Sequence, residues 1–135
     1  MRRAKKGEKI KGLVQGEMIE DLDALPFPAT DMIKTGIYLR EEQMNFEVPA
    51  AGILGSRWCP FLCSFCCIPA ISHKVRIRSP KNVVDEMEDV YDQCRCSYSF
   101  VDDCFILNKS RILEFCQEIV DRKMKVRFIG STRAN

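Results

Sequence analysis

The feature that most constrains this chain is a run of three cysteines within eight residues, Cys59, Cys63 and Cys66. Their C-x3-C-x2-C spacing leaves too few intervening residues to form anything but a tight loop. Three thiolates on one such loop can point at a single centre, and thiolates bind both zinc and iron–sulfur clusters. The spacing therefore predicts a metal or cluster site. An iron–sulfur cube held by three thiolates keeps one iron without a protein ligand and free to bind a small molecule.

Two other uses of these thiols stay open from the residues alone. A structural zinc ion needs four nitrogen or sulfur ligands, and Cys67 or His73 is the candidate for the fourth. No second C-x-x-C pair supports this site, and Cys67, directly after Cys66, would be strained in the same tetrahedron. A redox dithiol at Cys63 and Cys66 is the other alternative, but the flanking prolines favour a loop over the helix that such a motif starts.

Composition limits the remaining possibilities. With 135 residues, 46% of them hydrophobic, the chain can bury one core, so one domain is the ceiling. The 21 basic and 19 acidic residues give a formal charge of +2, which predicts neither a nucleic-acid partner nor an anionic membrane. Eight cysteines without a secretory leader or a membrane-spanning apolar run favour a cytoplasmic protein, where thiols serve as ligands or core residues more often than as disulfides.

The pattern changes along the chain. Residues 1–49 read as a basic tail followed by a linker, because the closely spaced Pro26 and Pro28 forbid regular helix and sheet pairing. Thr30 is a candidate cap for a short turn, and Gly36–Leu39 has strand character. Residues 50–135 form the second part, in which strand and helix patterns alternate.

This alternation predicts three strands and two helices. The expected strands are Ala50–Ser56, Ser97–Val101 and Lys125–Ile129. The first helix runs from Pro80, after the cap Ser79, to about Gln93, and the second runs from the cap Asn108 to Lys123. Helical spacing predicts that the first helix buries Val83, Val84, Met87, Val90, Tyr91 and Cys94, and the second Ile112, Leu113, Cys116, Ile119 and Val120.

Strand, helix, strand, helix, strand is the β/α unit of a parallel sheet, whose active residues gather at the carboxyl ends of the strands. The cysteine loop, Asp102–Asp103 and Thr132–Arg133 all follow such ends. We therefore expect these segments to lie close together.

The cysteine loop, with Phe65 directly before its last cysteine, closely resembles that of the radical S-adenosylmethionine (SAM) enzymes. The resemblance continues in order and spacing from about Ile19 to the end, and is similar to the subgroup that carries a cobalamin-binding domain before the barrel. Its downstream segments are Arg76–Pro80, Val83–Glu86, Phe100–Phe105 and Thr132–Asn135.

The resemblance implies an α/β fold: a partial (β/α)6 radical SAM barrel of about three units, preceded by the tail of a cobalamin-binding-like domain and its linker in residues 1–49. It implies a [4Fe–4S] cluster on Cys59, Cys63 and Cys66 that cleaves SAM reductively to a 5′-deoxyadenosyl radical. Cobalamin-dependent methyl transfer or a ring rearrangement would follow, with an electron donor such as flavodoxin or ferredoxin and a small-molecule or peptide substrate. The chain departs from the family in lacking a D-x-H-x-x-G motif and in having Ser72–His73 near an expected glycine.

The same resemblance assigns roles to further residues. Phe65 would neighbour the SAM adenine or else pack the loop against the barrel. Asp102 and Asp103 would accept hydrogen bonds from the SAM ammonium, although strand alternation lets only one point inward. Arg133 would reach SAM or substrate.

Arg76 and Arg78 would neutralise a carboxylate or the cluster, or form a surface ion pair. Two other functions stay open: a non-catalytic, zinc-stabilised interaction module, and an inactive truncated fragment with too few units to shield a radical.

Overall fold

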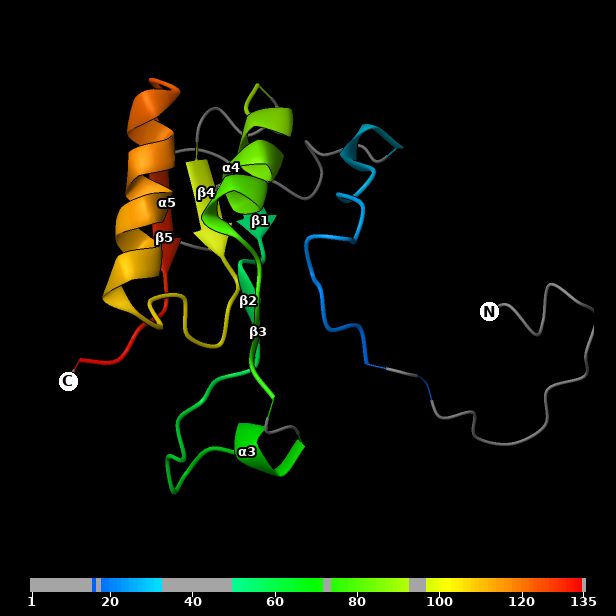
Figure 1. The fold of residues 1–135 in the computed structure, drawn as a ribbon, viewed down its shortest axis with the longest axis vertical. Coiled ribbons are helices and arrows are strands. Elements are labelled where there is room, and N and C mark those ends of the chain that lie inside the picture. The colour runs from blue at the N-terminus through cyan, green and yellow to red at the C-terminus, as the bar shows by residue number, and fades with distance from the viewer. Residues whose placement is uncertain (1–15, 17, 33–49, 72–73, 93–96, 135) are drawn as a thin grey trace, which may run out of the picture.

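The computed structural model describes residue 16 and residues 18–32, 50–71, 74–92 and 97–134, and its centre is a three-stranded parallel sheet (Figure 1). The strands β1 (Ala51–Ile53), β4 (Ser97–Phe100) and β5 (Arg127–Gly130) lie in the order β1-β4-β5. Ala51 pairs with Tyr98, and Tyr98 with Phe128. The helices α4 (Pro80–Asp89) and α5 (Lys109–Asp121) lie side by side over one face of this sheet. The predicted strand–helix–strand–helix–strand order is confirmed.

Both helices begin where the sequence predicts. The Ser79 side chain accepts a hydrogen bond from the Asn82 amide at 3.1 Å, and Pro80 is the first helical residue. The Asn108 side chain accepts one from the Arg111 amide at 2.8 Å. Helix α4 ends at Asp89, and its predicted end at Gln93 lies outside the described residues, as does Cys94.

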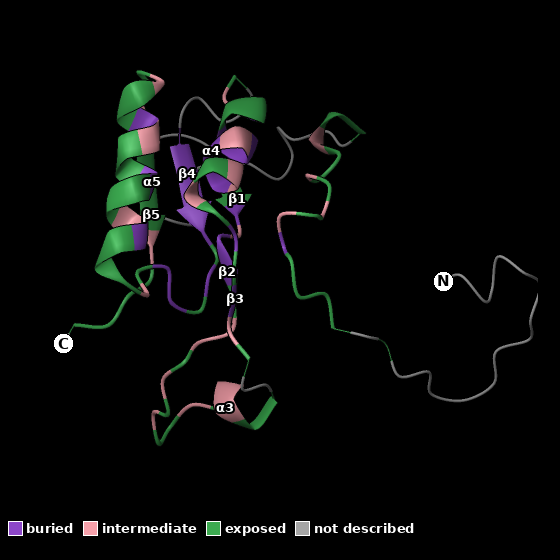
Figure 2. Ribbon diagram, viewed as in Figure 1, coloured by how far each residue is buried: buried purple, intermediate pink, exposed green. Residues whose placement is uncertain are grey.

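The core lies between the two helices and the sheet (Figure 2). On α4 the predicted Val83, Val84, Met87 and Val90 are all buried. Four phenylalanines, from β4, β5, α5 and the connection after β4, stack or meet edge to face, and the ring centroids of Phe100 and Phe105 are 3.8 Å apart. The four are Phe100, Phe105, Phe115 and Phe128, of which the first three are buried and Phe128 is 41% exposed.

The predicted apolar face of α5 is partly wrong. Ile119 is buried as expected and Ile112 is partly buried, but Leu113 and Val120 are 57% and 65% exposed, and Cys116 is exposed as well. The face that meets the sheet is instead the stripe Arg111, Phe115 and Ile119, at successive steps of four residues. Helical periodicity gave the correct period but the wrong phase, because an arginine occupies one of the inward positions.

A second, smaller ladder carries the cysteine loop. Strands β2 (Ser56–Arg57) and β3 (Arg76–Ile77) pair antiparallel, with Ser56 opposite Ile77. Between them the chain forms the cysteine loop and a short helix, α3 (Ile68–Ile71), which extend beyond the carboxyl ends of the parallel strands (Figure 1). The predicted single strand Ala50–Ser56 is therefore two strands, broken at Leu54–Gly55.

The segment predicted as a linker packs along this body. Leu22 is 3% exposed, the Asp23 carboxylate accepts a hydrogen bond from the Ser79 amide at 3.0 Å, and the Arg78 guanidinium lies 5.6 Å from the Phe27 ring centroid. A 3-10 turn, η1 (Thr30–Met32), follows at the expected position. The predicted basic tail, apart from Gly16, and the strand-like Gly36–Leu39 lie outside the described residues. None of the helices in the described residues combines the length and the apolar character that a membrane-spanning helix requires.

Candidate functional site

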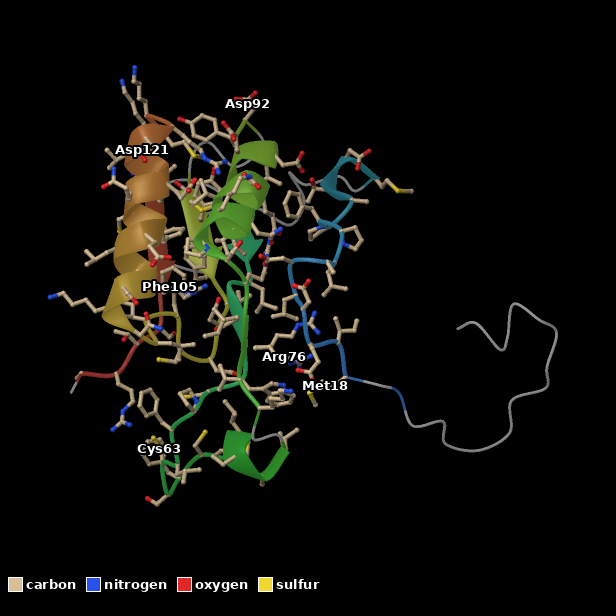
Figure 3. All side chains as sticks on the ribbon, in the orientation of Figure 1. Met18, Cys63, Arg76, Asp92, Phe105 and Asp121 are labelled. Carbon is tan, nitrogen blue, oxygen red and sulfur yellow. The ribbon has the colours of Figure 1, made fainter. Side chains whose placement is uncertain are left out.

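The cysteine loop leaves β2 and returns at β3, so its two ends are tied together by the ladder. Trp58 has a φ of 73°, in the left-handed region that non-glycine residues seldom adopt, and this turns the chain out of β2. The Cys66 amide donates to the Cys63 carbonyl at 3.0 Å, which closes the turn between the last two cysteines. Figure 3 shows Cys63 at the far end of the molecule from the body of the helices.

The thiols of Cys59, Cys63 and Cys66 are free and half-buried, whereas Cys67 is exposed. Among the described residues no group of three or more histidine, cysteine, aspartate or glutamate side chains could hold a metal ion. Three free thiols on one loop are the donor set of a three-cysteine cluster, whereas a structural zinc ion would need a fourth ligand. The alternative zinc ligand His73 lies outside the described residues.

The segment after β5 reaches this loop. The Arg133 guanidinium lies 4.2 Å from the centroid of the Phe61 ring, a cation–π contact between the third strand's carboxyl end and the loop. The structure therefore brings Arg133 to the cysteine loop. Its role toward SAM or substrate stays a prediction.

Cys104 is a neighbour of this site that sequence spacing did not single out. It is 2% exposed, and its thiol points toward the Ile106 carbonyl at 3.6 Å. Burial and the nearby Cys59 raise the pKa of the Cys104 thiol, while hydrogen bonds from the Arg133 backbone and the Thr132 side chain partly oppose that rise. The only sequence signal for it was its place directly after Asp102–Asp103.

The two adjacent aspartates at the end of β4 lie in different environments. Asp102 is 4% exposed, and its carboxylate accepts hydrogen bonds from the Gly55 amide at 2.9 Å and the Ser56 hydroxyl at 2.5 Å. Asp103 is exposed. Asp103 is thus the better placed of the two to meet a ligand ammonium, and that role stays a prediction.

A hollow of about 270 Å³ lies at the carboxyl ends of β1 and β4, beside the start of the cysteine loop. Asp103 and the exposed Arg57 give it one carboxylate and one guanidinium. The indole nitrogen of Trp58, which also lines the hollow, is buried and has no hydrogen-bond partner among the described residues. The sequence signal for Arg57 and Trp58 was their place immediately before Cys59. The remaining lining residues are Leu54, Ser56 and Val101.

Phe65 is 91% exposed, so it does not pack the loop against the sheet. That alternative is wrong in this structure, and the position of Phe65 beside the SAM adenine stays a prediction. An aromatic side chain this exposed is available to a flat ligand.

Arg76 and Arg78 are both buried, at 8% exposure each, and among the described residues neither forms the surface ion pair that was the alternative. Arg76 donates to the Ile19 carbonyl at 2.6 Å. Arg78 pairs with the buried Glu86 carboxylate. Arg78 therefore neutralises a carboxylate of α4, which ties β3 to that helix.

Comparison with known proteins gives this geometry a context. No protein-family model matches the chain. It is 26% identical over 133 residues to the "Uncharacterized methyltransferase PH0819" of Pyrococcus horikoshii, which covers 97% of this chain and 28% of that protein. It is 35% identical over 116 residues to the anaerobic magnesium-protoporphyrin IX monomethyl ester cyclase of Rubrivivax gelatinosus, covering 85% of the chain and 20% of the cyclase. The hopanoid C-2 methylase of Rhodopseudomonas palustris is 27% identical over 110 residues, covering 80% and 19%.

A solved structure matches as well. The radical SAM methyltransferase TsrM from Kitasatospora setae, determined with cobalamin and a [4Fe–4S] cluster bound, superimposes with a TM-score of 0.50 at 30% identity, over 56% of this chain and 14% of that one. The chain spans only 19% to 28% of the length of the three relatives above. The resemblance predicted from the sequence is thereby confirmed: the chain is similar to a segment of radical SAM methyltransferases and cyclases.

Proposed function

We propose that Cys59, Cys63 and Cys66 bind a [4Fe–4S] cluster whose fourth iron is open to SAM, in a radical SAM enzyme of which this chain is the cluster-binding part. The observation that carries the proposal is the loop itself: three free, half-buried thiols, held between paired strands at the carboxyl ends of a parallel sheet. When bound, such a cluster supplies the single electron that cleaves SAM reductively.

The chain's own residues would bind and orient the ligands. The three thiols must lose their protons to bind iron, so the loop holds thiolates in the loaded protein. The Asp103 carboxylate in the hollow would accept hydrogen bonds from the SAM ammonium, and the Arg57 guanidinium would pair with the SAM carboxylate. Phe65 would lie beside the adenine, and Arg133, over Phe61, would face the ligand from the third strand.

The relatives bear on the reaction that follows. Two are named as methyl-transferring proteins, one as a cyclase, and the solved relative contains cobalamin. We therefore propose cobalamin-dependent methyl transfer, or a ring rearrangement, with a low-potential donor such as flavodoxin or ferredoxin. What these reactions share is the reductive use of SAM, and the described residues serve that shared step.

The test is anaerobic reconstitution of the chain with iron and sulfide, followed by metal analysis and electron paramagnetic resonance of the reduced protein with and without SAM. We expect about four irons per chain and a cubane signal that SAM perturbs. Cys63→Ala should lose that signal, whereas Cys116→Ala, an exposed cysteine on α5, should keep it.

Uptake of one zinc and no cluster would overturn the proposal in favour of the zinc module. So would a cluster that Cys63→Ala retains, because the iron would then be held elsewhere. The variant Cys67→Ser distinguishes the zinc site from the cluster. It should release zinc from a four-ligand site but leave a three-cysteine cluster in place.

A further inference from the structure

A buried carboxylate and a buried guanidinium bind the same short backbone segment, one at the amide of Gly55 and the other at its carbonyl. The Asp102 carboxylate, at the end of β4, accepts hydrogen bonds from the Gly55 amide and the Ser56 hydroxyl. Arg111, on α5, donates from Nη2 to the Gly55 carbonyl at 2.9 Å. We call these four residues, Gly55, Ser56, Asp102 and Arg111, the Gly55 clamp.

The clamp is charged although it is shielded from water. Ser56 is 1% exposed, Asp102 4% and Arg111 8%. Burying charged groups is costly unless each finds partners, and here Asp102 and Arg111 lie near enough to interact electrostatically. Arg111 also donates to the Arg78 and Phe105 carbonyls, each at 3.4 Å. A turn at Gly55 alone would not require these charged side chains, because water could form the same hydrogen bonds to an exposed backbone.

Gly55 fits the clamp because it has no side chain. A Cβ at this position would lie 3.0 Å from Nη2 of Arg111 and 3.3 Å from Oδ1 of Asp102, closer than ordinary contacts allow. The Gly55 carbonyl also accepts a hydrogen bond at 3.0 Å from the amide of Arg78, which directly follows β3, the strand that returns from the cysteine loop. Both the outgoing and the returning strand of the loop are therefore fixed at this one residue.

The clamp is close to the cysteines along the chain. Ser56 begins β2, and Cys59 is three residues further on, after the left-handed turn at Trp58. Each residue spans at most about 3.6 Å, so this short connection has little slack. A shift of Ser56 is therefore passed on to Cys59. Asp102 has both oxygens engaged in this task, which separates its role from that of the exposed Asp103.

We infer that Asp102 and Arg111 are positioning residues, which fix Gly55–Ser56 and thereby set where the three thiols of the cysteine loop stand. The part of this inference that concerns the cluster rests on the proposed function. The part that concerns the loop does not, and is tested without metal.

The first experiment uses the metal-free chain. Amide hydrogen exchange and the alkylation rate of Cys59 by iodoacetamide are compared in the wild type, Asp102→Asn and Ser56→Ala, with the exposed Asp89→Asn as the matched control. A hydrogen bond to a charged group stabilises by about 1.5–3 kcal/mol, so we expect residues 55–66 to exchange about tenfold faster or more in Asp102→Asn. Helices α4 and α5 should keep wild-type exchange. Ser56→Ala, which removes only one hydroxyl, keeps the test decisive if Asp102→Asn unfolds the chain.

The second experiment uses the reconstituted chain. If the clamp positions the thiols, Asp102→Asn should lose its cluster to a chelator about tenfold faster. It should also show a weaker SAM-induced change in the resonance spectrum per cluster. Lower stability alone would not produce this second effect. Asp89→Asn should behave as the wild type.

Unchanged exchange in residues 55–66, or an equal rise in α4, α5 and the loop, would overturn the inference, because the clamp would then serve general stability only. A wild-type chain that takes up no cluster would sink the proposed function, while the exchange of residues 55–66 still decides the inference. If the wild type binds the cluster normally but Asp102→Asn leaves the exchange of residues 55–66 unchanged, the proposed function stands and the inference about the clamp is overturned.

Discussion

The buried ion pair between Arg78 and Glu86 gives the sharpest test of what holds β3 to α4. The two side chains are 10% and 6% exposed. Arg78 also donates to the Asn82 side chain at 2.7 Å and to the Leu54 carbonyl at 2.9 Å. Replacing Arg78 by methionine leaves Glu86 as an uncompensated charge in a site shielded from water.

Breaking such a pair on one side destabilises a protein by about 3–5 kcal/mol, so Arg78→Met should lower the free energy of unfolding by that amount. The matched control is the exposed pair of Lys81 and Asp85, joined at 2.8 Å one helical turn apart, with Lys81 69% exposed. Lys81→Met should cost no more than about 0.5 kcal/mol. The measurement is urea unfolding followed by the helical circular dichroism signal.

A third variant separates charge from packing. Arg78→Met combined with Glu86→Leu should recover much of the lost stability, because replacing both members of a buried pair by apolar groups is often neutral. The reasoning is refuted if Arg78→Met costs no more than Lys81→Met. It is also refuted if the double variant is no more stable than Arg78→Met, since the buried charge would then not be the cause.

Three further predictions concern packing, capping and pH. Gly130→Ala should destabilise the fold by about 1–3 kcal/mol, because its Cβ would lie 3.0 Å from the Phe105 ring. Gly52→Ala should not, because its Cβ meets only a Val101 methyl at 3.9 Å. Equal unfolding midpoints of the two variants would contradict this prediction. Asn108→Ala should cost about 1 kcal/mol by removing the cap of α5, and Lys109→Ala much less, as measured by the same unfolding experiment; equal losses would show that the cap is unimportant. Burial would raise the pKa of Asp85, but hydrogen bonds from Lys81 and Arg122 outweigh it and lower that pKa. Its stabilising effect is therefore present at neutral pH and lost as the pH falls through the folded pKa, so the wild type should lose more stability on acidification than Asp85→Asn; parallel pH profiles would refute this.

Local signals in the sequence predicted most of the elements because these signals act over a few residues. Ser79–Pro80 and Asn108 start helices wherever a cap can reach the free amides, and the apolar stripe of α4 needs only helical geometry. The cysteine spacing likewise defines one loop whatever surrounds it. The family resemblance rested on such ordered segments, and the relatives confirm it.

Tertiary structure decided which side of an element faces inward and what each polar group meets. The phase of α5 depends on Arg111, which points inward because it donates to the Gly55 carbonyl and interacts with the Asp102 charge. Gly55 and Asp102 both belong to other segments of the sequence. Adjacent acids looked equivalent in the sequence, yet the hydrogen bonds from Gly55 and Ser56 bury Asp102 and leave Asp103 at the hollow. Spacing along the chain thus predicted three candidate thiol ligands and the succession of strands and helices, whereas contacts between distant segments, which no local pattern encodes, decided the surroundings of those thiols.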